Sequence, residues 1–79
     1  MMEATTTYTT IHATETTTIE VDQDGRYYLT SNAVTRELVT PWMYAGWGDD
    51  AIKNMRDGFA GDGMADEHIE GYIRQALGE

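Results

Sequence analysis

The stretch VDQDGRYYL, residues 21–29, constrains the fold of this chain more tightly than any other segment. An Asp-Gly pair between two runs of β-branched and aromatic residues is a strong signal for a β-hairpin. A loop of residues 23–25 puts Gly25 at its left-handed position and places Val21 opposite Tyr27, whereas a two-residue loop would shift that pairing by one position. The three-residue loop is therefore predicted, because it gathers four side chains on one face of the hairpin: Ile19, Val21, Tyr27 and Leu29.

The first half of the chain has the composition of strands. Threonine, tyrosine and isoleucine dominate residues 5–10 and 16–21, and their branched or aromatic side chains suit a pleated surface. HATET, residues 12–16, is a plausible turn between them. We expect residues 5–10 to form an exposed edge strand, which could pair with a second copy of the chain.

Helical spacing replaces the strand pattern after Thr30. Residues 31–38 are predicted to form a short helix, and Pro41 begins an aromatic helix or turn. A further helix begins at Asp49 and ends in the glycine-rich GFAGDG, and the last runs over residues 64–77.

These patterns predict an α+β fold in a single compact domain over residues 1–79, with a three-stranded antiparallel meander followed by two or three short helices. Trp42 or Trp47 is expected to close one end of the core. The expected core consists of eleven apolar residues: Ile19, Val21, Leu29, Val34, Leu38, Ile52, Met55, Phe59, Ile69, Ile73 and Leu77.

Charge is the second strong feature of the sequence. Fourteen Asp and Glu stand against five Lys and Arg, which gives a formal net charge of -9 on 79 residues. Such a negative field repels nucleic acid and anionic membranes and attracts basic protein surfaces. We therefore expect a protein partner rich in Lys and Arg, with no direct nucleic-acid or membrane binding. The alternative without a binding role is that the acidity keeps a small protein soluble or suits a salty cytoplasm.

The acidic residues of the second half provide the candidate binding site. Asp62, Asp66 and Glu70 recur every fourth residue, so if this segment is helical they form one row of carboxylates about 6 Å apart. Helix caps and a Glu70–Arg74 pair are the structural alternatives. The predicted partner-binding residues are Asp49, Asp50, Asp57, Asp62, Asp66, Glu67 and Glu70.

The aromatic cluster of Trp42, Tyr44 and Trp47 has two possible uses. Side chains this large in a small domain form a corner of the core, or they remain exposed as a patch that faces a partner. The first use is the more common one, and the patch is the alternative binding surface.

No catalytic, cofactor or metal site is expected. The chain has no cysteine, a single serine and two histidines, His12 and His68, and it lacks a phosphate-binding glycine loop. DQDG resembles part of a calcium loop but lacks the remaining ligands. The absence of cysteine, of a signal-peptide pattern and of an apolar span favours a cytoplasmic location.

In size, acidity, lack of cysteine and β-then-α order, the chain resembles the small anti-CRISPR proteins of phages, in particular inhibitors of the type I Cascade complex. That family shares no common motif, so the resemblance assigns no residues. It implies a non-enzymatic inhibitor that occludes DNA recognition by contacting Lys and Arg on Cascade in the cytoplasm of the host cell. Because of the exposed edge strand, we expect a monomer or a weak homodimer. Alternatives are an acidic mimic aimed at another DNA-handling enzyme, a small structural or assembly protein, and a small metal-binding enzyme.

Overall fold

The computed structural model describes residues 5–32, 35–44, 46 and 48–78. It confirms the α+β class, with an antiparallel sheet in the order β1-β2-β3-β4. The sheet has four strands, so the predicted three-stranded meander is wrong by one strand. The elements are β1 Tyr8–Ala13, β2 Thr17–Asp22, β3 Tyr27–Ser31, β4 Glu37–Leu38, the 3-10 helix η1 Pro41–Tyr44, α1 Asp49–Gly61 and α2 Asp66–Leu77.

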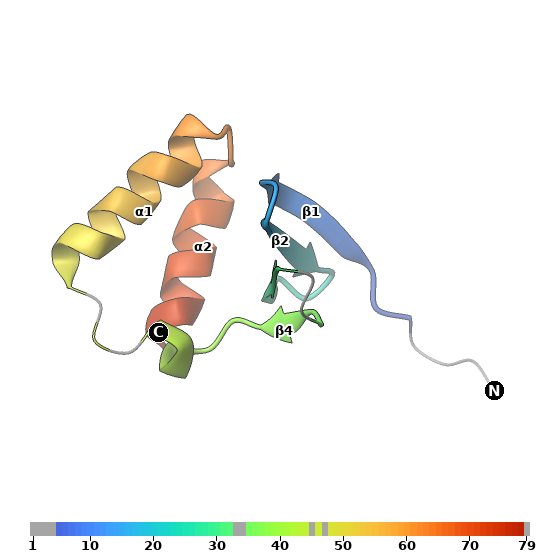
Figure 1. The fold of residues 1–79 in the computed structure, drawn as a ribbon. Coiled ribbons are helices and arrows are strands. Elements are labelled where there is room, and N and C mark those ends of the chain that lie inside the picture. The colour runs from blue at the N-terminus through green and yellow to red at the C-terminus, as the bar shows by residue number, and fades with distance from the viewer. Residues whose placement is uncertain (1–4, 33–34, 45, 47, 79) are drawn as a thin grey trace.

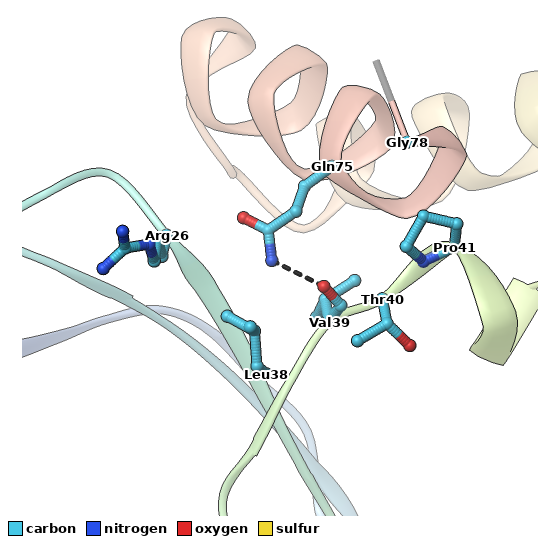
Figure 2. A pocket seen from close by; sticks show the side chains of 7 residues that line it. All are labelled: Arg26, Leu38, Val39, Thr40, Pro41, Gln75 and Gly78. Atoms are coloured by element: carbon cyan, nitrogen blue, oxygen red, sulfur yellow. Dashed lines mark hydrogen bonds between the residues drawn. The ribbon is translucent and has the colours of Figure 1, made fainter.

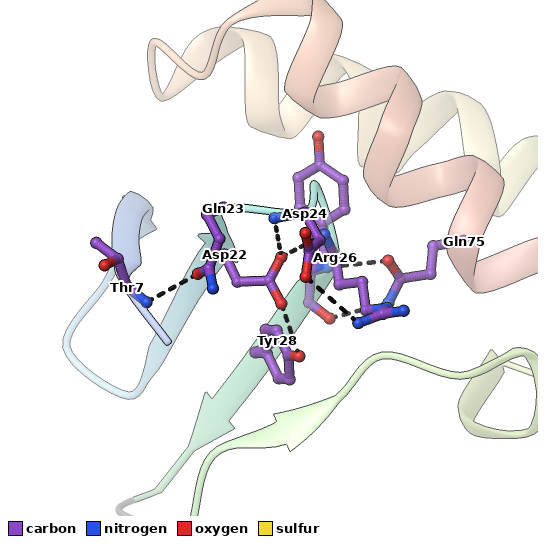
Figure 3. A network of polar contacts seen from close by, with 8 residues as sticks. Thr7, Asp22, Gln23, Asp24, Arg26, Tyr28 and Gln75 are labelled. Carbon is purple, nitrogen blue, oxygen red and sulfur yellow. Dashed lines mark hydrogen bonds and ion pairs between the residues drawn. The ribbon is translucent and has the colours of Figure 1, made fainter. Parts of the chain in front are cut away.

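The β2–β3 hairpin has the predicted register. Val21 pairs with Tyr27, and Gly25 has a φ of 83° at the third loop position. Asp22 stabilises the turn, because its Oδ1 accepts the N–H groups of Asp24 at 2.8 Å and Arg26 at 3.0 Å. Its Oδ2 accepts the Tyr28 hydroxyl at 2.9 Å (Figure 3). These bonds, led by the one from the Arg26 N–H, hold the pKa of Asp22 below its usual value.

Residues 35–38 are not helical, contrary to the prediction for residues 31–38. Leu38 pairs with Tyr28 across β3 and β4, and the N–H of the next residue, Val39, donates to the Tyr27 carbonyl. Extended backbone sends successive side chains to opposite faces. Val39 therefore fills the core at 1% exposure, while the predicted core residue Leu38 is 43% exposed. Val34 lies outside the described residues.

The helices form two layers on one face of the sheet (Figure 1). α2 lies between the sheet and α1, which runs antiparallel to it. Every described residue of α1 is at least partly exposed, because its apolar side covers α2 without reaching the centre of the core. Gly78 follows the end of α2 and has a left-handed conformation, with a φ of 81°.

The core confirms most of the predicted positions. Ile19, Val21, Ile69 and Ile73 are buried, and Leu29, Ile52, Met55 and Phe59 are half-buried against them. The prediction is wrong for Leu77, which is 40% exposed at the end of α2. The remaining core residues come from β3, from the loops and from α2: Tyr27, Val39, Met64, Tyr72 and Ala76.

Gly25→Val should lower the free energy of unfolding by about 1 kcal/mol or more, because a β-branched residue is poorly tolerated at a φ of 83°. A Cβ at this position meets no atom within 4 Å, so the effect comes from the backbone alone. Urea unfolding measures it. Gly25→Asn is the control and should cost less, since Asn adopts the left-handed conformation more readily. Equal stability of the valine variant would contradict this register.

Gly71→Ala in α2 should destabilise the protein by about 1 kcal/mol or more, although alanine is the better helix former. A Cβ on Gly71 would lie 2.6 Å from the hydroxyl oxygen of the buried Tyr27. Gly58→Ala is the matched control in α1, where a Cβ meets nothing within 4 Å, and it should stabilise the protein. Thermal unfolding of the pair compares the two. Stabilisation by both changes would show that Tyr27 does not pack closely on α2.

Candidate functional site

Acidic residues lie in the first turn of each α-helix, where the helix dipole favours carboxylates. Asp49 and Asp50 begin α1, and Asp66 and Glu67 begin α2. All four are exposed, as is Asp57 further along α1, and none has an ion pair within the part of the chain that the structure describes. Because the two helices are antiparallel, the two acidic turns lie at opposite ends of a helical layer roughly 18 Å long.

The row of Asp62, Asp66 and Glu70 does not form on a single helix. Asp62 is the C-terminal cap of α1, and the N-cap of α2 is Ala65, so the prediction of Asp62 as a helix-starting cap is wrong. Oδ2 of Asp62 lies 3.6 Å from Nδ1 of His12, which reaches it from β1. The glycine-rich turn ends α1 at Asp62 and thereby separates this carboxylate from the other two.

Glu70 already has a cationic partner inside the protein. Its carboxylate accepts two hydrogen bonds from Arg56 of α1, at 2.8 Å and 2.9 Å, instead of the predicted pairing with Arg74. This fork holds the pKa of Glu70 below its usual value. Glu70 joins α1 to α2 and is therefore a weak candidate for contact with a partner.

A second arginine is engaged on the open face of the sheet. Arg36 forms a fork with Glu20, at 2.9 Å and 3.1 Å, and its guanidinium lies 3.7 Å from the centre of the Tyr8 ring. Residues 49–77 carry seven carboxylates against three Lys and Arg, one of which is Arg56. The helical surface thus keeps five exposed carboxylates without an ion pair among the described residues: Asp49, Asp50, Asp57, Asp66 and Glu67.

The aromatic cluster divides between core and solvent. Tyr44 is half-buried, and its hydroxyl is hydrogen-bonded to that of the buried Tyr72. Trp42 is 85% exposed, so it does not close an end of the core, and Trp47 lies outside the described residues. Of the two described members of the cluster, Trp42 therefore lies on the surface.

A pocket of about 340 Å³ lies between the hairpin loop, β4 and the end of α2 (Figure 2). The sequence contained no clear signal for it, because its walls come from three separate segments. They are formed by Arg26, Leu38, Val39, Thr40, Pro41, Gln75 and Gly78. Among these described residues Arg26 alone carries a charge.

Gln75 forms the inner wall of the pocket and joins three elements. Its Oε1 accepts the Tyr27 N–H at 2.9 Å, and its Nε2 donates to the carbonyls of Tyr27 at 2.9 Å and Val39 at 2.7 Å (Figures 2 and 3). These bonds occupy the amide, so the pocket offers a ligand mainly apolar walls. The Arg26 guanidinium at its rim lies 3.7 Å from the Asp24 carboxylate.

The titratable side chains of the described residues form few clusters of the kind found in catalytic sites. His68 Nδ1 is hydrogen-bonded to the Tyr27 hydroxyl at 3.1 Å, and burial raises the pKa of Tyr72. No group of three His, Cys, Asp or Glu side chains among the described residues is placed to hold a metal ion. Within the same part of the chain, no helix has the length and apolarity needed to cross a membrane. Comparison of the chain with protein-family models, curated proteins and solved structures finds no match.

Gln75→Glu should destabilise the protein by about 2 kcal/mol or more, because a carboxylate cannot donate to the Val39 carbonyl and repels both carbonyl oxygens that the amide now contacts. The Tyr27 carbonyl keeps the N–H of Val39 as a donor. Gln23→Glu is the matched control. Gln23 only accepts the Thr7 N–H in the described contacts, and a carboxylate can still accept it. Chemical denaturation of both variants at neutral pH measures the difference. Similar stabilities would show that Gln75 is not an essential link.

Proposed function

We propose that the protein is a non-enzymatic inhibitor that binds a basic, nucleic-acid-binding surface of another protein through its helical layer. The observation that carries this proposal is the set of five exposed carboxylates without ion pairs in the described structure: Asp49, Asp50, Asp57, Asp66 and Glu67. Asp62 and Glu70 have internal partners and take secondary places in the contact surface.

The internal pairing of arginines supports the proposal. Arg36 and Arg56 are each bound to a glutamate, so neither is free to compensate the first turns of the helices. Exposed charges of one sign attract an opposite surface over about a Debye length, roughly 10 Å at 0.1 M salt. Two acidic turns at opposite ends of one layer would contact a basic groove at two places, as separated phosphates of a bound nucleic acid do.

The resemblance in size, charge and element order to small anti-CRISPR proteins makes a type I Cascade complex the first partner to test. In this proposal the protein occupies Lys and Arg side chains that hold target DNA, in the cytoplasm of the host cell. No cofactor takes part. Another DNA-handling protein with a basic groove would be recognised by the same chemistry.

The test is a titration of purified type I Cascade complexes with the protein, with labelled target DNA as competitor, at low and high salt. We expect DNA to be displaced and binding to weaken as salt rises. Asp66→Lys combined with Glu67→Lys should weaken binding at least about tenfold. Binding is measured well below the melting temperature, because two lysines in the first turn of α2 oppose the helix dipole and lower that temperature.

Glu15→Lys combined with Glu37→Lys is the matched control, since it changes the net charge equally on exposed positions of the sheet half. It should weaken binding less than the helical pair does. Equal effects of the two double variants would show that net charge alone causes the attraction. Binding that is insensitive to salt or does not compete with DNA would refute the mimic mechanism.

A further inference from the structure

The exposed large apolar side chains of the described structure gather around one end of the molecule. Trp42 is 85% exposed, and Leu38 and Leu77 are 43% and 40% exposed. Leu38 lines the pocket described above, while Trp42 and Leu77 each neighbour a lining residue, Pro41 and Gly78. An indole this exposed leaves a large apolar surface in water, and contact with a partner surface would bury it.

Trp42 is carried by a fixed element. η1 packs against α2, and the hydrogen bond between Tyr44 and Tyr72 joins the two. Pro41 packs closely on the end of α2, since a Cβ built on Gly78 would lie 3.0 Å from its Cγ. A side chain held on such a base loses little backbone freedom on binding, which makes it a suitable anchor.

The adjacent pocket has the size and chemistry to receive a large apolar side chain. Its volume of about 340 Å³ is near the lower end of the usual range for ligand pockets, roughly 300 to 1,000 Å³. Leu38, Val39 and Pro41 provide apolar walls, and the amide of Gln75 is already hydrogen-bonded. Trp42 does not fill the pocket of its own chain, given its exposure.

We propose that two copies of the protein associate at this end, with Trp42 of each copy in the pocket of the other. A two-fold interface requires a self-complementary surface, and here the anchor and the pocket lie side by side on one chain. Two chains of net charge -9 repel each other, and the described lining of the pocket contains no carboxylate and one cation, Arg26. Arg26 lies 3.7 Å from the Asp24 carboxylate, so the charged rim of the pocket is close to neutral and adds little to the repulsion between two copies. The proposal does not depend on the function of the acidic helical layer.

The edge strand β1 is the competing surface for self-association. It is six residues long and contains no Lys or Pro, which are common protections of an open edge. However, its pairing register shifts between Thr10 and His12, and such an irregularity hinders the addition of another strand. Thr10→Lys tests this edge, because it adds a charge at an exposed position of β1.

Light scattering coupled to size exclusion, over protein concentrations up to roughly 1 mM, tests the proposal. We expect the mass to rise from the 8.9 kDa of one chain toward twice that value. Trp42→Ala should raise the dissociation constant of the dimer at least about tenfold, and Thr10→Lys should leave it nearly unchanged.

Leu38→Arg separates pocket blocking from charge. It makes the chain less acidic, which by itself favours association, yet it places a charged side chain in the pocket wall and should weaken the dimer. Thr35→Arg is the matched control, with the same change in charge at an exposed residue that does not line the pocket. A monomer at every concentration, or a dimer that is insensitive to Trp42→Ala and Leu38→Arg, would overturn the proposal.

Discussion

The side chain of Gln75 is the link on which the arrangement of sheet and helices depends. One amide satisfies the N–H and carbonyl of Tyr27 at the start of β3 and the carbonyl of Val39 after β4. Both residues are buried, and an unsatisfied backbone group at such a place costs about 1 to 3 kcal/mol. Gln75 thus holds α2 against β3 and against the residue that follows β4, at the wall of the pocket.

On the opposite face of the sheet, no helix of the described residues lies over the strands, and polar side chains cover it. Arg36 lies over the ring of Tyr8 while it pairs with Glu20, and Tyr28 donates to Asp22. The pairing of Arg36 with Glu20 on this face uses one of the five Lys and Arg residues in the chain. A second arginine joins the two helices through Glu70, so internal demand for cations is one physical reason why the remaining helical carboxylates stay uncompensated.

Sequence patterns correctly predicted the elements that depend on residues close together in the chain. The Asp-Gly loop defined the register of β2 and β3, and the acidic starts and glycine ends of α1 and α2 were found close to their positions. The prediction failed at residues 35–38, where Leu38 and Val39 pair with β3, a partner distant in sequence. It failed again for Asp62. The glycine-rich turn that ends α1 separates Asp62 from α2, so the four-residue spacing of Asp62 and Asp66 does not place them on one helix.

The sequence by itself determined the negative field, the α+β class and the hairpin register, since these follow from composition, periodicity and turn chemistry. Only the tertiary structure decided which acids remain available and which apolar residues are exposed. Arg56 could reach Glu70 or another carboxylate with equal local plausibility, and Trp42 could lie inside or outside the core. Those choices depend on contacts between distant segments, and the energies of such contacts are set by packing rather than by local spacing.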